Sequence, residues 1–361
     1  MLEITAKELK TALGYLQNAS QKRGTMPILQ NIAIQGNGEE VMLTATDMEQ
    51  QITFKAQCSK AEIDTTIEFD KLFKWSSKFK DDQILKFKQT TDEQITVTCG
   101  RNRAKFKSLP TKEFPFFSEK HDEQTINFNG SDLVDSVKKA QSMAGNNDVR
   151  AYLNAVALDV KGNTCNVVAT NGHCLIKIQL ECVNESGFKG IMLIPVSSVN
   201  GFVKCLDEQP VSMKVSNNSV CFSDVVLSYA TKLIDGRYPD YQRVIPVGND
   251  KEFKFNCQEL KESVNRAVVF GDGKMTIMKM IVDSSGNECN IIVRATDNTE
   301  ADEVVSVISS HELEMGLNAT YLTDAVNKVS SEDISLMVKD ADSAVLVEEE
   351  NTTMVIMPAR V

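Results

Sequence analysis

Hydrophobic and polar positions along this chain follow a helical pattern and a two-residue alternating pattern. The same succession of these two patterns is found three times. In each occurrence a short extended run leads into apolar residues at helical spacing, at 4–13, 128–137 and 255–264. The matching leucines, Leu9, Leu133 and Leu260, lie 124 and 127 residues apart. Segments with strict two-residue alternation follow, such as 41–46 and 226–231. Each copy therefore predicts helices packed on antiparallel strands.

Other landmarks recur at nearly the same spacing. Strands end at Thr46, Thr170 and Thr296, which are 124 and 126 residues apart. A second helical stretch recurs at 70–79, 197–206 and 320–329, and late strand ends carry Leu109, Leu233 and Met357. Four landmarks in one order predict an α+β fold of three tandem copies of one domain, each with two helices on antiparallel sheets. The expected domains are residues 1–122, 123–249 and 250–361.

Glycine-containing segments between the alternating runs predict tight turns, because glycine accepts the positive φ that such turns require. The three clearest are 36–38, 162–163 and 285–287.

Composition limits the class of protein. The 361 residues are 42% apolar and 25% charged, which is typical of globular domains. No run of 18 apolar residues predicts a membrane span, and the N-terminus lacks the pattern of a secretory signal. The nine cysteines include no CxxC pair. We expect a cytoplasmic protein with free, mostly buried thiols and no metal or cofactor.

Charge is unevenly distributed. The chain carries a net charge of −11, yet its six predicted helices together carry +7. Most of this excess lies in the first copy, where residues 5–24 and 69–80 each carry +3. A surface that gathers the helices would attract an anionic partner such as DNA, since salt screens charges beyond about 8 Å. Ordinary solubility explains the same distribution, so charge alone leaves both interpretations open.

Several strings are more specific. They are TMPIL at 25–29, DVRAYLN at 148–154, VATNGH at 168–173, KLIDGRYPDYQRVIP at 232–246 and VIMPARV at 355–361. In this order and over the whole chain they resemble the bacterial DNA polymerase III beta subunit, the sliding-clamp family. The resemblance implies a head-to-tail homodimer whose six domains close a ring, with helices lining the hole. Such a protein has no catalytic residues, encircles double-stranded DNA without reading its sequence, and tethers the replicative polymerase.

The resemblance also implies two sets of binding residues. On the DNA face, Arg23 and Tyr152 match contacting residues of the family, and Asn147 stands where glutamine is familiar. Asp70 and Ser197 stand where the family has basic residues. The positive charge of the first copy adds Lys71, Lys74 and Lys78, so the expected DNA-binding set is Arg23, Lys71, Lys74, Lys78, Asn147, Arg150 and Tyr152. Reversing the charge of Lys71, Lys74 and Lys78 should therefore weaken loading or DNA retention more than reversal at Lys204 and Lys328.

The second implied site is a cleft between the middle and last domains for short, partly hydrophobic peptides of polymerases, the clamp loader and repair proteins. The matching positions are Leu153, Thr170, Gly172, His173, Leu175, Pro239, Arg243, Val244, Tyr321, Ala344, Val355, Met357, Pro358 and Arg360. Apolar side chains offer anchor pockets and the Arg and His side chains offer polar contacts. Ala344 and Ala359 depart from residues found in some relatives, which predicts a cleft of altered depth.

Alternative interpretations of local motifs remain weaker. His173 lacks an accompanying nucleophile motif, and 271–274 (GDGK) lacks the spacing of a phosphate loop. Cys165, Cys174 and Cys182 fit no common zinc spacing. Trp75, with Phe73 and Phe79 at helical spacing, favours core packing over base stacking. Two classes of protein remain: a DNA clamp and partner platform, or an enzyme or scaffold of the same triplicated domain. Triplication fits both, and the family strings favour the clamp.

Overall fold

The computed structural model describes residues 1–21, 26–91, 93–117, 124–206, 209–271, 273 and 276–360. These residues form two compact units. The first unit comprises 1–135, 182–188 and 197–233, and the second comprises 136–181, 189–196 and 234–361. In the described part of the chain, no helix has the length and apolar character needed to cross a membrane. The middle third of the sequence contributes strands to both units.

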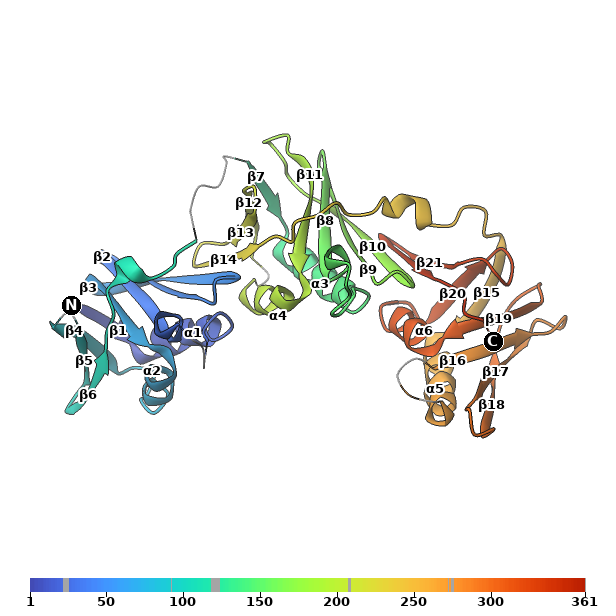
Figure 1. Ribbon diagram of the computed structural model, residues 1–361, viewed down its shortest axis with the longest axis horizontal. Helices are drawn as coiled ribbons and strands as arrows, with labels where there is room; N and C mark the ends of the chain where they lie inside the picture. Colours follow the sequence, from blue (N-terminus) through green and yellow to red (C-terminus); the bar gives the residue numbers. More distant parts are fainter. Residues whose placement is uncertain are drawn as a thin grey trace. The chain divides into compact units, whose positions relative to one another are not determined.

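The first unit is built on one ten-stranded antiparallel sheet (Figure 1). Its strand order is β6-β5-β4-β1-β3-β14-β13-β12-β7, and β2 pairs with β3 outside this path. The strands are β1 Leu2–Thr5, β2 Asn31–Thr46, β3 Gln50–Glu68, β4 Ile84–Thr91, β5 Gln94–Cys99, β6 Asn102–Lys107, β7 Thr125–Phe128, β12 Val211–Val215, β13 Ser219–Ser223 and β14 Leu227–Lys232. Strand β14, from the middle third of the sequence, pairs with β3 from the first third.

Two helices in this unit, α1 Ala6–Leu16 and α2 Phe69–Ser76, contact each other and β3 (Figure 1). Thr5 caps α1, because its side-chain oxygen accepts the backbone N–H of Glu8. Leu9, Leu13 and Leu16 then bury one face of the helix. The Trp75 ring lies edge-on to Phe79 at 4.7 Å and to Phe106 at 6.2 Å. Trp75 is half-buried, so it packs against these rings at the edge of the core and not inside it.

The second unit contains an eight-stranded and a four-stranded sheet, both antiparallel. The larger has the order β11-β8-β9-β10-β22-β21-β20-β15 and the smaller β18-β17-β16-β19. The strands of the larger sheet are β8 Ala155–Lys161, β9 Thr164–Thr170, β10 Cys174–Glu181, β11 Lys189–Pro195, β15 Lys251–Asn256, β20 Asp333–Val338, β21 Val345–Glu349 and β22 Thr352–Ile356. Those of the smaller are β16 Ile277–Val282, β17 Glu288–Arg294, β18 Glu300–Ser306 and β19 Leu313–Asn318.

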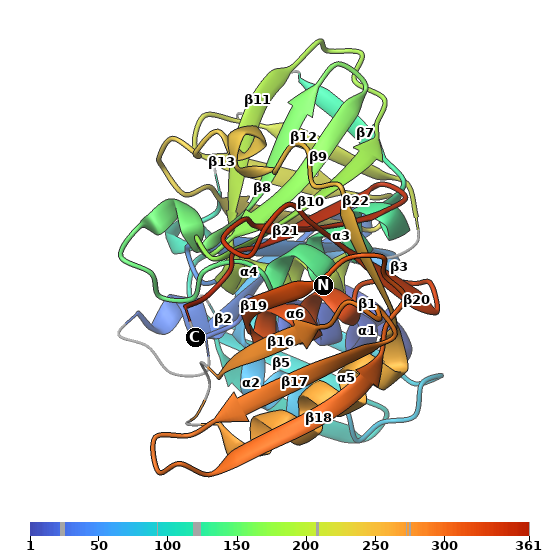
Figure 2. The same cartoon turned by 90° about the vertical axis from the view of Figure 1, so that its right-hand side faces the viewer.

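Helices α5 Cys257–Ala267 and α6 Ala319–Val326 contact each other, and α5 lies against β17 and β18 (Figure 2). Asn256 and Asn318 cap them, each accepting two backbone N–H groups. Of the remaining helices, α3 Gly130–Gln141 begins inside the repeated run at 128–137, and α4 Val196–Cys205 begins one residue before the predicted stretch at 197–206. Leu9, Leu133 and Leu260, the landmarks of the first repeated helix, all have 0% exposure.

Two local predictions are wrong. Residues 36–38 form no turn, because β2 continues through them and its register with β3 shifts between Gly38 and Glu40. A Cβ on Gly36 would lie 2.6 Å from the Cβ of Ala61, so glycine is needed there for close strand approach. Lys328 is no surface lysine: it is 9% exposed, and its ammonium donates to the carbonyl oxygen of Asp324 at 3.0 Å. Lys328 is therefore unsuitable as a surface-charge comparison.

Candidate functional site: an apolar groove over the larger sheet

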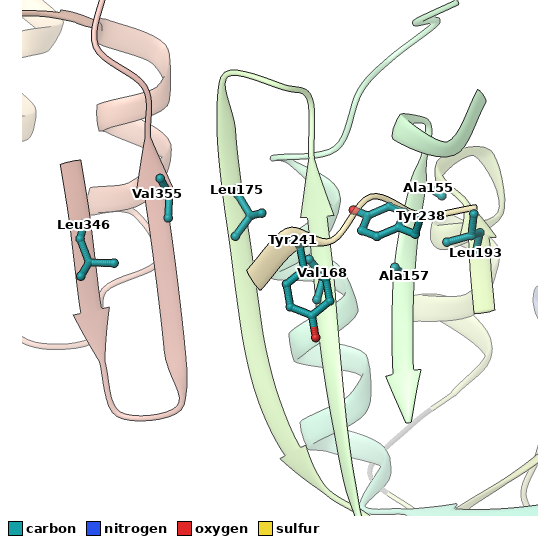
Figure 3. Packing of buried hydrophobic residues seen from close by; sticks show 9 residues of the cluster. All are labelled: Ala155, Ala157, Val168, Leu175, Leu193, Tyr238, Tyr241, Leu346 and Val355. Atoms are coloured by element: carbon teal, nitrogen blue, oxygen red, sulfur yellow. The ribbon is translucent and has the colours of Figure 1, made fainter. Parts of the chain in front are cut away.

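A groove of about 250 Å³ lies in the second unit, over strands β9, β10 and β22. Its floor follows from the strand register, since Leu175 pairs with Thr170 on one side and with Val355 on the other. Directly opposite residues of antiparallel strands share a face, so these three side chains lie in one row. Leu175 and Val355 are 3% and 2% exposed and belong to a cluster with Val168 and Leu346 (Figure 3).

One wall is the segment that follows β14 in the sequence. Its Tyr238 and Tyr241 rings are buried in the same cluster, over β8 and β9 (Figure 3). The Tyr241 hydroxyl donates to Oδ2 of Asp159 at 2.7 Å, and the Lys161 ammonium donates to the same oxygen at 2.8 Å. Burial, and then the hydrogen bond to Asp159, raise the pKa of Tyr241 above its ordinary value. This anchor holds Pro239 and Val244 at the groove.

The turn between β9 and β10 forms the opposite wall. The Thr170 hydroxyl donates to the carbonyl of Cys174 at 2.6 Å and accepts the N–H of Gly172 at 3.0 Å. Gly172 has φ +90°, a left-handed conformation that favours glycine. The His173 ring stacks on Tyr321, with ring centroids 6.4 Å apart and an interplanar angle of 11°. Side-chain and backbone bonds therefore fix this wall before any ligand arrives.

Arg150 and Asp148 form a polar rim. The guanidinium donates twice to the Asp148 carboxylate, with both distances 3.0 Å, and the Arg150 backbone N–H donates to it at 2.8 Å. The Arg150 side chain, followed by its backbone N–H, lowers the pKa of Asp148 to about 2. Nη2 of Arg150 would lie 3.3 Å from a Cβ on Gly172, so the guanidinium covers the turn closely.

Most of the predicted cleft residues meet at this groove. Those that line it are Leu153, Thr170, Gly172, His173, Leu175, Pro239, Val244, Val355 and Met357. The other five lie outside its lining: Tyr321 stacks on His173, Ala344 packs beside the cluster, Arg243 pairs with Asp240 at 2.9 Å, and Pro358 and Arg360 follow β22.

The sequence prediction missed three lining residues, Cys174, Asp240 and Tyr241. Two of them, Asp240 and Tyr241, lie within the 232–246 string, so the string signalled the segment without separating its roles. Arg150 and Tyr152, expected on the DNA face, also line the groove.

The chemistry of the groove is that of binding. Burial raises the pKa of the Cys174 thiol to about 12, so this sulfur stays protonated at neutral pH and is no nucleophile. Within the described residues, no group of three or more His, Cys, Asp or Glu residues could hold a metal ion. Apolar floor residues beside Arg and His side chains are typical of a surface that accepts a peptide.

The predicted DNA-contacting lysines belong to the first unit. Lys71 and Lys74 lie on α2 with side chains 70% exposed, and Lys78 follows the helix as an exposed residue. Carboxylates partly neutralise two of them, because Lys71 pairs with Glu68 at 2.7 Å and Lys74 with Asp70 at 2.6 Å. Asn147 is exposed with φ +58°. Arg23 lies outside the described residues.

Fold and groove together define a binding protein made of repeated helix-and-sheet modules. Family models of the DNA polymerase III beta subunit match nearly the whole chain: the N-terminal domain at 1–118, the central domain at 127–240 and the C-terminal domain at 242–360. The chain belongs to the DNA polymerase III beta subunit family and has the non-catalytic function of a DNA sliding clamp.

Individual relatives agree with this assignment. The beta sliding clamp of Vibrio cholerae is 28% identical over 350 residues, covering 94% of this chain and 93% of the relative. The beta sliding clamp of Escherichia coli is 27% identical over 346 residues, with the same coverage. Among solved structures, the DNA polymerase III subunit beta of Pseudomonas aeruginosa has a TM-score of 0.94 at 26% identity and covers 100% of both chains. A Pseudomonas aeruginosa sliding clamp bound to griselimycin has a TM-score of 0.93 at 25% identity, covering 100% of this chain and 99% of that one.

Proposed function

We propose that two copies of this chain close head-to-tail into a ring around double-stranded DNA in the cytoplasm, and that the ring tethers the replicative polymerase, the clamp loader and other partners. Each copy contributes three clamp domains, at 1–122, 123–249 and 250–361. The observation that carries the proposal is a strand pairing that occurs twice inside the chain, β3 with β14 and β10 with β22, and that leaves a matching pair of strands open.

The open pair is β18 and β6. Strand β18 follows the third copy of the Ala-Thr strand end, as β3 and β10 follow the first and second. Strand β6 precedes Leu109, as β14 precedes Leu233 and β22 precedes Met357. Both β18 and β6 are edge strands of their sheets. Edge strands present unpaired N–H and C=O groups, so β18 of one copy can pair with β6 of another.

Their charges are complementary. The exposed side chains of β6 include Arg103, Lys105 and Lys107, whereas those of β18 include Glu300 and Asp302. Two copies of β6 repel each other, as do two copies of β18, so the charges favour the head-to-tail pairing over either symmetric one. Head-to-tail contact closes a ring when the rotation between copies is right.

Retention on DNA follows from the ring together with weak phosphate contacts. Lys71, Lys74 and Lys78 offer charges that attract the phosphate backbone without reading base edges. Such contacts leave the ring free to slide. The groove over β10 and β22 supplies the second requirement, a place for a short apolar peptide that belongs to a partner protein.

The experiment is a loading assay on nicked circular DNA with the purified chain, its clamp loader and ATP. We expect the protein to co-elute with circular DNA on gel filtration and to be released when a restriction enzyme linearises the circle. Equal retention on circular and linear DNA would contradict encirclement. Light scattering on the purified chain alone should give a mass near twice 40.0 kDa, and a mass of one chain at micromolar concentration would contradict the closed dimer.

A further inference from the structure

We propose that the first unit carries a second peptide-docking groove. It is the internal repeat of the first groove, which lies over β10 and β22 of the second unit. It is lined by Met48, Pro115, Phe116, Phe117, Ser216, Asn217, Asn218, Ser219 and Lys232. Its occupant is a short peptide segment of a partner protein in which an acidic residue lies next to an aromatic or large aliphatic residue. This inference rests on the proposed function, because the groove of the second unit serves as its template.

One wall of each groove is formed by a corresponding segment of the chain. Phe114, Pro115 and Phe117 precede Tyr238, Pro239 and Tyr241 by 124 positions each. Phe114 packs with Ile28, Leu29 and Ala33. Tyr238 packs in a cluster that includes Tyr152 and Ala157, which are the counterparts of Ile28 and Ala33 at the same spacing. The segment that forms one wall is therefore anchored in the same way in both units.

The turn that forms the other wall is also repeated. The Thr46 hydroxyl donates to the carbonyl of Gln50 at 2.8 Å and accepts the N–H of Met48 at 3.0 Å, as Thr170 does with Cys174 and Gly172. Met48 has φ +75°, where its counterpart Gly172 has φ +90°. Met48 therefore places an apolar side chain, 38% exposed, at a position where the first groove has a glycine and no side chain.

A backbone hydrogen bond at the end of the groove is also found in both units. The N–H of Lys232 donates to the carbonyl of Glu49 at 2.9 Å, as the N–H of Met357 donates to that of His173 at 2.9 Å. Lys232 therefore occupies the place of Met357, one residue earlier than the Leu233 landmark in the sequence suggests. A lysine replaces an apolar anchor at this point, and the two grooves differ in the chemistry of the ligand that fits.

The floors of the two grooves differ. The counterparts of Leu175 and Val355 are Gln51 and Ala230, which pair across β3 and β14 but lie outside the lining of the second groove. The Gln51 side-chain oxygen accepts the N–H of Phe117 at 2.8 Å. Apolar contact therefore comes from the rim, from Met48 and from Phe116, which is 38% exposed. The hollow measures about 380 Å³, compared with about 250 Å³ for the first groove.

Charge identifies the rest of the ligand. Lys232 is the one charged residue among the described lining residues, and its side chain is 43% exposed. Its pairing with Glu49 at 3.3 Å, with the carboxylate 70% exposed, is a weak surface contact that a ligand carboxylate can replace. Ser216, Asn217 and Asn218 offer hydrogen bonds to a peptide backbone. An apolar anchor for the aromatic rim and an acidic residue for Lys232 complete the match.

The test uses the full chain and a fluorescein-labelled peptide, Gly-Phe-Glu-Leu-Gly, followed by fluorescence anisotropy. We expect Phe116→Asp and Lys232→Glu each to weaken peptide binding by about tenfold. Lys232→Arg and Lys112→Glu are the controls and should bind like the unmodified chain, because the first keeps the charge and Lys112 lies outside this groove. A benzophenone side chain in place of the peptide Phe should crosslink to Met48.

The outcomes separate this proposal from the first groove. Binding that is lost in Met357→Asp but unchanged in Phe116→Asp and Lys232→Glu, with crosslinks at Met357, would overturn the second groove and leave the first intact. Absence of binding to the unmodified chain at millimolar peptide would also overturn it. Failure of the ring proposal is read separately, from the loading assay and the mass of the particle.

Discussion

The hydroxyl of Tyr241 donates a hydrogen bond of 2.7 Å to Asp159, a residue that lies 82 positions earlier and is 1% exposed. Nearby, the hydroxyl of Tyr238 is buried without a hydrogen-bond partner among the described residues. The two tyrosines of one segment thus form a natural comparison between a bonded and an unbonded phenol.

Removal of the Tyr241 hydroxyl should loosen the wall of the first groove. Tyr241→Phe leaves a buried carboxylate short of one donor, and we expect a loss of about 2 kcal/mol in the free energy of unfolding together with weaker peptide binding. Tyr238→Phe is the matched control and should be neutral or slightly stabilising. Urea denaturation of both variants measures the difference, and equal stability of the two would show that the bond to Asp159 contributes nothing.

Low pH should weaken the ion pair between Asp148 and Arg150 at the rim of the first groove. Because the folded-state pKa of Asp148 is about 2, below the ordinary 3.8, the stabilisation by Arg150 is present above pH 4. It is lost as the pH falls from about 4 towards 2, as the carboxylate takes up a proton. A carbon-detected NMR titration of the Asp148 carboxyl group checks this. Arg150→Met should return the pKa towards 3.8, and an unchanged pKa in that variant would assign the shift to another cause.

DNA retention should weaken when positive charge is removed at and after α2, and strengthen when a negative charge of α2 is removed. Glutamate at Lys71, Lys74 and Lys78 should weaken retention and reduce the slope of log affinity against log salt by about 0.9 for each phosphate that is no longer neutralised. Lys204→Glu is the comparison, since Lys204 is an exposed lysine on α4. Asp70→Asn releases Lys74 from its ion pair and should strengthen retention. Equal losses in the triple variant and Lys204→Glu would refute the concentration of DNA contacts on the first domain.

Charge exchange should test the contact between β6 and β18. Arg103→Glu with Lys105→Glu should separate the dimer, and so should Glu300→Lys with Asp302→Lys, because each places like charges across the contact. The four substitutions together should restore it. Analytical ultracentrifugation distinguishes one chain from two. If all three variants sediment as dimers, the charged strands lie elsewhere in the assembly.

Much of the local structure could be predicted from the sequence, because it depends on short-range patterns. Periodicity predicted a helix at each α-helix of the described residues, and the structure adds that Thr5, Asn256 and Asn318 cap three of them. The 232–246 string marked the segment that walls the groove. These signals lie within a few residues of the features they specify, since capping and amphipathicity involve neighbours in the chain.

The groove itself needed the tertiary structure. Glycines at 36 and 38 signalled a turn, but pairing with β3 keeps the strand continuous. Lys328 and Asp159 carry ordinary charges in the sequence, and only the packing around them makes both buried.

By itself, the sequence predicted the triplicated fold, the family and nine of the residues that line the first groove. Only the tertiary structure decided that Tyr241 is tied to Asp159 and that Lys232 takes the place of Met357 in a second, aromatic-rimmed hollow. The physical reason is that a side chain's burial and partners depend on strand register. Register is set by the sum of contacts between residues far apart in the chain, to which a local pattern contributes only part.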